Sequence, residues 1–188
     1  MNRTNFLSAI ILIAIGVVGR FVLVSYVGIP NLEIVTALTL VSGIYLGGIY
    51  AVIVPLFIIF LSDLVIGNNY IFVFTWTAFA FIGLFGLLYK KYRFQNSKFK
   101  IQNSFCLAIG SSAFFYLYTN FGWWLMSGMY EYNLSGLIKC YLMAIPFFRN
   151  NLVGNLIFVP VGIRVASKVL RSIKEKGYEI KKHCCENS

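Results

Sequence analysis

KKYRFQNSKFKIQN, residues 90–103, decides how this chain is interpreted, because it is the one long hydrophilic connection between apolar runs. It carries five basic residues and no acidic residue. The apolar runs on either side of it cover residues 6–27, 34–46, 49–66, 70–89, 104–118 and 137–169. Lipid offers the backbone no hydrogen-bond partners, so long continuous runs indicate helices, whereas β-barrel strands alternate over about ten residues. We therefore predict an all-α fold, an integral membrane bundle of six transmembrane helices.

The composition excludes an ordinary soluble domain. Of the 188 residues, 59% are hydrophobic and only 12% are charged, which is about half the charged share of soluble proteins. A net charge of +10 is also found in nucleic-acid-binding proteins, but here the basic residues lie in blocks beside apolar runs. We therefore expect them to face the lipid bilayer and not nucleic acid.

The basic residues also predict the orientation. Arg3, the 90–103 linker and residues 164–182 together hold thirteen of the 16 basic residues. With six spans all thirteen lie on one side, and basic loops stay in the cytoplasm. Five or seven spans would place the linker and the tail on opposite sides. We predict a multi-pass protein of the plasma membrane with both termini cytoplasmic, a transmembrane domain over residues 1–173 and a polar cytoplasmic tail over 174–188.

Most other polar residues gather in the connections that this topology places outside, residues 28–33, 67–70 and 119–136. We predict a ligand pocket there, with walls of Asn120, Trp123, Trp124 and Tyr130 and a floor of Arg149, Asn150 and Asn155. Arg149 has the best claim to the ligand, since a guanidinium can form two bonds to a carboxylate, phosphate or amide edge. Two alternatives stay open: an interfacial aromatic belt, and an ion pair of Arg149 with Asp63 or Glu131.

The spacing within the last run limits this pocket. At about 100° per residue, Asn155 faces about 120° away from Arg149, whereas Asn151 shares the face of Asn155. Arg149 and the two asparagines are therefore not all expected to reach one small ligand. Pro146, just before them, predicts a helix that is kinked or interrupted.

Two charged residues lie inside apolar runs at similar depth, Arg20 in the first and Asp63 in the third. An ionisable group in a span usually has a partner or a role, so we expect these two to pair, in the site or in the structure. The alternative for Arg20 is that its side chain extends to the outer headgroups.

The sequence lacks the motifs of common enzymes and metal sites. His183 is its only histidine, and it contains no GxSxG, HExxH or Walker A pattern. Among four cysteines, Cys184 and Cys185 are adjacent, and no pair has CxxC spacing. We therefore predict no enzyme, no metal and no cofactor, and any ATP would be used by a partner.

The blocks SDLVIG (62–67), TNFGWW (119–124) and PFFRN (146–150) resemble an uncharacterised group of six-helix membrane proteins. That group is usually placed with the substrate-binding (S) components of energy-coupling factor (ECF) vitamin transporters, and the resemblance covers the second to the sixth run. It implies that the chain binds a vitamin or related micronutrient at the extracellular side and works with a transmembrane coupling subunit and two ATPases. The small residues Ala9 and Gly16 of the first helix would form the docking contact.

Other functions stay open. One alternative is an importer that acts alone. Another is a membrane scaffold or cell-envelope accessory protein whose outward residues bind other proteins. A lipid-modifying enzyme is a further alternative, with Asp63 and Glu131 as its only candidate acids.

Overall fold

The computed structural model describes residues 3–68, 70–95 and 102–186, and this part of the chain forms six α-helices. Two of them end in a five-residue π-helical turn, η1 or η2. The elements are α1 (Arg3–Val22), η1 (Leu23–Val27), α2 (Val35–Val41), η2 (Ser42–Leu46), α3 (Tyr50–Ile66), α4 (Phe72–Gln95), α5 (Gln102–Met126) and α6 (Leu134–Glu186). The predictions of an all-α fold and of six helices are confirmed.

Three of the described helical stretches are long and apolar enough to cross a membrane, namely Arg3–Val27, Phe72–Lys91 and Leu134–Ser172. They indicate a multi-pass membrane protein. Val35–Leu46 and Tyr50–Ile66 are apolar but shorter. The seven residues of α2 and the five of η2 span only about 18 Å, which is less than the roughly 30 Å of a bilayer core.

The short helix α2 lies in the centre of the bundle, in contact with α3, α4 and α6. Every residue from Val35 to Ile44 is buried. Close packing here depends on glycine, because a Cβ atom on Gly43 would overlap the carbonyl oxygen of Gly83 on α4. Large apolar side chains on α1, α4 and α6 face outward instead, as expected of surfaces that contact lipid.

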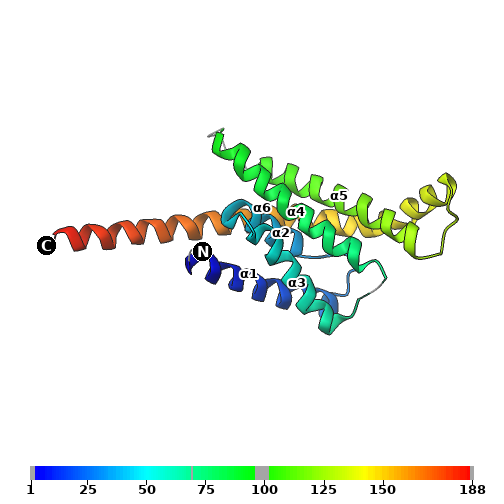
Figure 1. Cartoon of the computed structure of the whole chain (residues 1–188), viewed down its shortest axis with the longest axis horizontal. Coiled ribbons are helices and arrows are strands. Elements are labelled where there is room, and N and C mark those ends of the chain that lie inside the picture. Colours follow the sequence, from blue (N-terminus) through cyan, green and yellow to red (C-terminus); the bar gives the residue numbers. More distant parts are fainter. Residues whose placement is uncertain (1–2, 69, 96–101, 187–188) are drawn as a thin grey trace.

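The connections 28–34, 67–71 and 127–133 lie at one end of the bundle, whereas α1 begins near the other end and α6 extends beyond it (Figure 1). Two helix pairs form the sides: α1 packs against α3, and α5 against α6 (Figure 1). This arrangement brings three connections that are distant in sequence to the same end of the bundle.

Two boundaries differ from prediction. Helix α5 continues to Met126, so the last connection is only 127–133 and not 119–136. Helix α6 runs without a break through Pro146 and Pro160, so of the two predicted alternatives near Pro146 the interruption is wrong, and the kink stays a prediction. A proline removes one backbone bond, and contact with neighbouring helices keeps such a helix continuous in lipid. The same helix continues to Glu186 and includes Cys184 and Cys185 of the predicted polar tail.

The small residues of α1 lie inside the bundle. Ala9 and Gly16 are both buried, and a Cβ atom on Gly16 would come within 2.6 Å of Ile58 Cδ1 on α3. The face of α1 that was expected to dock a partner therefore packs against α3, because small residues allow these two helices to approach closely.

Candidate ligand-binding site

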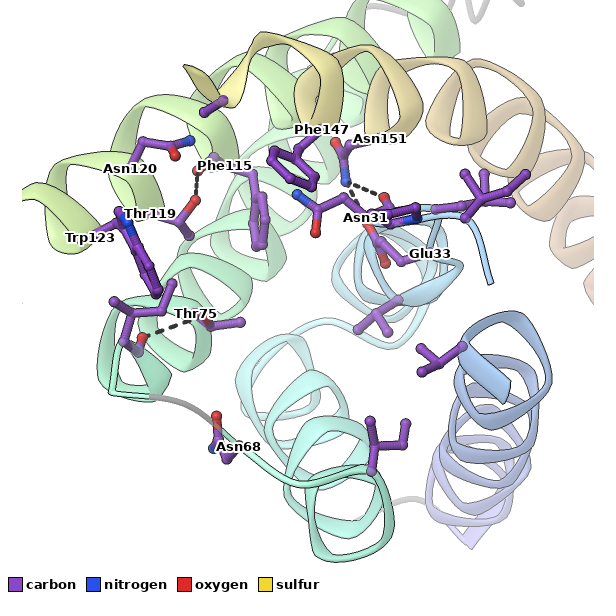
Figure 2. Close-up of a pocket in the computed structure, with 18 of the residues that line it drawn as sticks. Asn31, Glu33, Asn68, Thr75, Phe115, Thr119, Asn120, Trp123, Phe147 and Asn151 are labelled. Carbon is purple, nitrogen blue, oxygen red and sulfur yellow. Dashed lines mark hydrogen bonds between the residues drawn. The ribbon is translucent and has the colours of Figure 1, made fainter. Parts of the chain in front are cut away.

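A cavity of about 960 Å³ lies at the end of the bundle that carries the three connections. It lies between the ends of α1 and α3 on one side and α5 and α6 on the other (Figure 2). Its polar and charged lining residues include Arg20, Asn31, Glu33, Asp63, Asn68, Thr75, Thr119, Asn120 and Asn151; its aromatic ones are Phe79, Phe115, Trp123, Tyr130 and Phe147.

Five of the residues singled out from the sequence line this cavity: Asn120, Trp123, Tyr130, Arg20 and Asp63. Asn120 and Trp123 lie three residues apart near the end of α5, where one helical face points into the cavity (Figure 2). The Asn120 amide donates to the carbonyl of Tyr116 over 2.8 Å, one turn earlier. The polar end of α5 is thus part of the cavity wall.

The other four predicted ligand contacts do not line the cavity. Trp124 donates its Nε1–H to the carbonyl of Glu131 over 3.0 Å. The side chain of Arg149 is exposed, and Asn150 donates to the carbonyl of Pro30 over 3.1 Å. Asn155 is fully buried. In the part of the chain that the structure describes, Arg149 also forms no ion pair with Asp63 or Glu131.

The predicted pair of Arg20 and Asp63 is confirmed. Arg20 Nη1 lies 2.5 Å from Asp63 Oδ1 and also donates to Ser62 Oγ. The second oxygen of Asp63 accepts bonds from Asn68 Nδ2 over 2.9 Å and from Trp76 Nε1 over 3.0 Å. Asp63 therefore joins α1, α3, the 67–71 connection and α4, and it forms one charged edge of the cavity.

Glu33 is a second carboxylate in the cavity wall, just before α2. Its Oε2 accepts the backbone N–H of Thr36 over 2.9 Å, and its Oε1 accepts the Thr36 hydroxyl over 2.5 Å. Both bonds hold it at the N-terminus of α2, where a negative charge is favourable. Burial nevertheless raises the pKa of Glu33 above its ordinary value, against the opposing effects of its hydrogen bonds and of nearby Arg20.

Asparagines of α6 connect the cavity to the core. Asn151 lines the cavity and donates to the carbonyl of Asn31 and to Glu33 Oε1 over 3.5 and 3.4 Å (Figure 2). One turn further on, Asn155 donates to Asn151 Oδ1 over 3.0 Å and to Ser112 Oγ of α5 over 2.9 Å. Asn155 thus acts beneath the cavity by orienting Asn151.

The predicted walls and floor of the pocket did not include Glu33, Asn31 or Asn151, although the first two lie in the outward connection 28–33 and Asn151 was placed on the face of Asn155. A weak signal for Glu33 was present, because it lies just before an apolar run and acidic residues are enriched at the start of a helix. The i, i+4 spacing of Asn151 and Asn155 also marked one face of α6. Nothing in the sequence showed that this face, and not that of Arg149, points inward.

The lining combines amides, aromatic rings and three charged side chains, which suits the binding of a small organic molecule. Within residues 3–68, 70–95 and 102–186, no group of three or more histidine, cysteine or acidic side chains lies close enough together to hold a metal ion.

Comparison with known proteins identifies a family. The sequence model of a family described as "Family of unknown function (DUF6580)" matches residues 1–173. No curated protein and no solved structure matches the chain.

Proposed function

The chain belongs to the family of unknown function DUF6580, and from its cavity we propose that it is a membrane-embedded substrate-binding protein for uptake. In this proposal it captures a vitamin or a related micronutrient at the extracellular face. The observation that carries the proposal is the cavity of about 960 Å³ enclosed by helix ends and connections. This volume lies in the usual range of about 300–1,000 Å³ for small-molecule sites.

Capture fits this cavity better than conduction does. The lining comes from the end of the bundle with the three connections. Towards the other end the core is filled by fully buried side chains such as Leu40, Ile82 and Ile163. Carriers with two-sided access place the site near the bilayer middle, reachable from both faces. A one-ended cavity above a packed core suits a protein that binds a molecule and hands it on.

Uptake against a gradient would then depend on partners. The basic residues of the linker and tail support a cytoplasmic location for the opposite end of the bundle, and in this orientation the cavity would open to the outside. The resemblance to S components supports a transmembrane coupling subunit with two ATPases as those partners. Because Ala9 and Gly16 pack inside the bundle, docking would use another face of the protein.

The test is to find the captured molecule. The protein would be purified into phosphatidylcholine nanodiscs, and released small molecules would be identified by mass spectrometry against empty nanodiscs. Trp123→Ala and Asn120→Ala should each reduce the retained amount about tenfold, the effect of losing roughly 1.4 kcal/mol of contact. Arg149→Ala is the matched control, since its side chain lies outside the cavity, and it should retain the molecule.

Two results would contradict the proposal. One is that no small molecule is enriched over empty nanodiscs, which would favour the scaffold alternative. The other is that Arg149→Ala loses an enriched molecule while Trp123→Ala keeps it, which would move the site away from this cavity.

A further inference from the structure

The cavity has an unbalanced charge. The charged side chains among its described lining residues are Arg20, Glu33 and Asp63. Arg20 contacts Asp63 at 2.5 Å, with exposed side-chain fractions of 20% and 7%, so these two charges largely cancel. Glu33 then remains as the one carboxyl group of the described lining without an ion pair, and it adds a negative charge to the cavity when it is ionised.

The bonds that Glu33 accepts do not neutralise it. Within the described residues, its donors are the backbone N–H groups of Val35 and Thr36, the Thr36 hydroxyl and the Asn151 amide. These neutral groups fix the direction of the carboxylate but leave its charge in place. An ionised group away from water is stabilised chiefly by an opposite charge. The cavity itself is the open side from which such a charge can approach.

The aromatic side chains of the lining also favour a positively charged ligand. Trp123 and Phe115 line the α5 side of the cavity, and Phe147 lines the α6 side (Figure 2). The faces of such rings attract cations within about 6 Å. For an anion, the lining offers only Arg20, which already contacts Asp63, while Arg149 lies outside.

We propose that this cavity selects an organic cation, with an ammonium group or a positively charged ring nitrogen held by the Glu33 carboxylate and bordered by the aromatic walls. This inference rests on the proposed capture function and adds the chemical class of the ligand. It reverses the expectation from the sequence, in which Arg149 suited a carboxylate or phosphate.

The preference of the cavity for cations over anions can be measured without knowing the ligand. Caesium, iodide and acrylamide quench tryptophan fluorescence by collision and carry a positive, a negative and no charge. Trp76→Phe/Trp124→Phe leaves Trp123 as the only tryptophan, inside the cavity, and Trp76→Phe/Trp123→Phe leaves Trp124 as the control outside it. With each constant divided by that of acrylamide, the caesium-to-iodide ratio at Trp123 should be about five times the ratio at Trp124. A negative local potential of about 0.8 kT per unit charge gives this factor, because it enriches the cation and depletes the anion to the same extent.

Glu33→Gln in the Trp123-only protein should abolish this preference, while Glu131→Gln removes an equal charge outside the cavity and should leave it unchanged. Circular dichroism checks that each variant is folded. A second measurement needs no substitution at Glu33: lowering the pH of the Trp123-only protein protonates the carboxylate and should produce the same loss.

Equal quenching by caesium and iodide at Trp123 overturns the inference, and so does a preference that survives both Glu33→Gln and low pH. A neutral or anionic molecule identified by mass spectrometry would also overturn it, while leaving capture itself intact. If caesium is preferred but no molecule is enriched, the charge of the cavity is supported and the capture function fails. The two proposals can therefore fail separately.

Discussion

Asp63 is the residue whose loss should damage the fold most directly, because it accepts bonds from Arg20, Asn68 and Trp76. Removing one partner of a buried ion pair typically costs about 3–5 kcal/mol, since the other charge is left uncompensated. We expect Asp63→Ala to lower the free energy of unfolding by about 3 kcal/mol, or the melting temperature by roughly 6–12 °C. Thermal unfolding in detergent, followed by circular dichroism, measures the shift.

A double substitution tests how much of the loss comes from the interaction between Arg20 and Asp63 and how much from their other contacts. Arg20→Met/Asp63→Ala should cost less than the sum of the two single changes, because no unpaired charge remains. Lys139→Ala, at an exposed position on α6, is the control and should stay within about 0.5 kcal/mol of the original protein. Additive losses would mean that the two charges do not interact.

Glu33 should make the unliganded protein less stable as the pH rises. Its pKa is raised in the folded state from an ordinary 4.5, so between these two values the folded chain binds more protons than the unfolded chain. Stability from this group is therefore complete below 4.5 and is lost as the pH rises through the raised pKa. The charged groups that also border the cavity, Arg20 and Asp63, are present in any variant at position 33.

Melting temperatures of the unliganded protein and of Glu33→Gln, measured from pH 4 to pH 8, isolate this effect. The original protein should lose more stability than the variant as the pH rises across this range. Parallel curves would assign the pH dependence to other groups.

At the scale of single residues, the sequence predicted which charged side chains lie at the same depth in the bundle. It was less informative about which side chains point inward. Arg20 and Asp63 were expected to pair because they lie at similar depth in their runs, and they do pair. The 100° step of a helix also separated Arg149 from Asn151 and Asn155. It could not tell which of the two faces points inward, because that depends on where α2 and α5 lie against α6.

Among the helices, α4 can pack closely against α3 only because residue 83 is a glycine. A Cβ atom on Gly83 would overlap the backbone carbonyl oxygen of Ala51 on α3, and a backbone atom cannot move aside as the end of a side chain can. We expect Gly83→Ala to cost about 3 kcal/mol through overpacking. Gly110→Ala on α5 is the matched control, since a Cβ there meets nothing within 4 Å, and it should be neutral or stabilising by up to about 1 kcal/mol.

Thermal unfolding of both variants tests the packing of α4. If Gly83→Ala melts at the temperature of the original protein, α3 and α4 do not approach as closely as described. A loss in Gly110→Ala of the same size would show that the cost comes from replacing any helical glycine, and not from this contact.

The apolar runs predicted the existence of the six helices but not their ends. Polar and aromatic residues over 119–126 looked like a loop, yet they form the last turns of α5, and Thr119, Asn120 and Trp123 among them line the cavity. Pro146 looked like a break, yet α6 continues through it. In both places tertiary contacts, which the local sequence does not contain, decide the conformation.

For the whole molecule, the orientation in the membrane is the prediction to check first. In a protein whose four cysteines are replaced, single cysteines would be placed at Asn96 in the basic linker, at Ser188 and at Tyr132 in the 127–133 connection. A membrane-impermeant thiol reagent should label Tyr132→Cys in intact cells and the other two only after permeabilisation, because basic loops stay inside. Labelling of Asn96→Cys from outside would exclude six spans with cytoplasmic ends.

The short central helix also has a consequence for biosynthesis. The translocon releases a segment sideways into lipid when about 20 of its residues together favour lipid over water. The seven residues of α2 and the five of η2 are too few, and they include Thr36, Thr39 and Ser42. Its three main neighbours are the helices α3, α4 and α6, and all of them are synthesised after it. A nascent chain must therefore keep α2 beside its earlier helices until α6 leaves the ribosome, and a chain truncated before α6 would present an unfinished bundle to the proteases of membrane quality control.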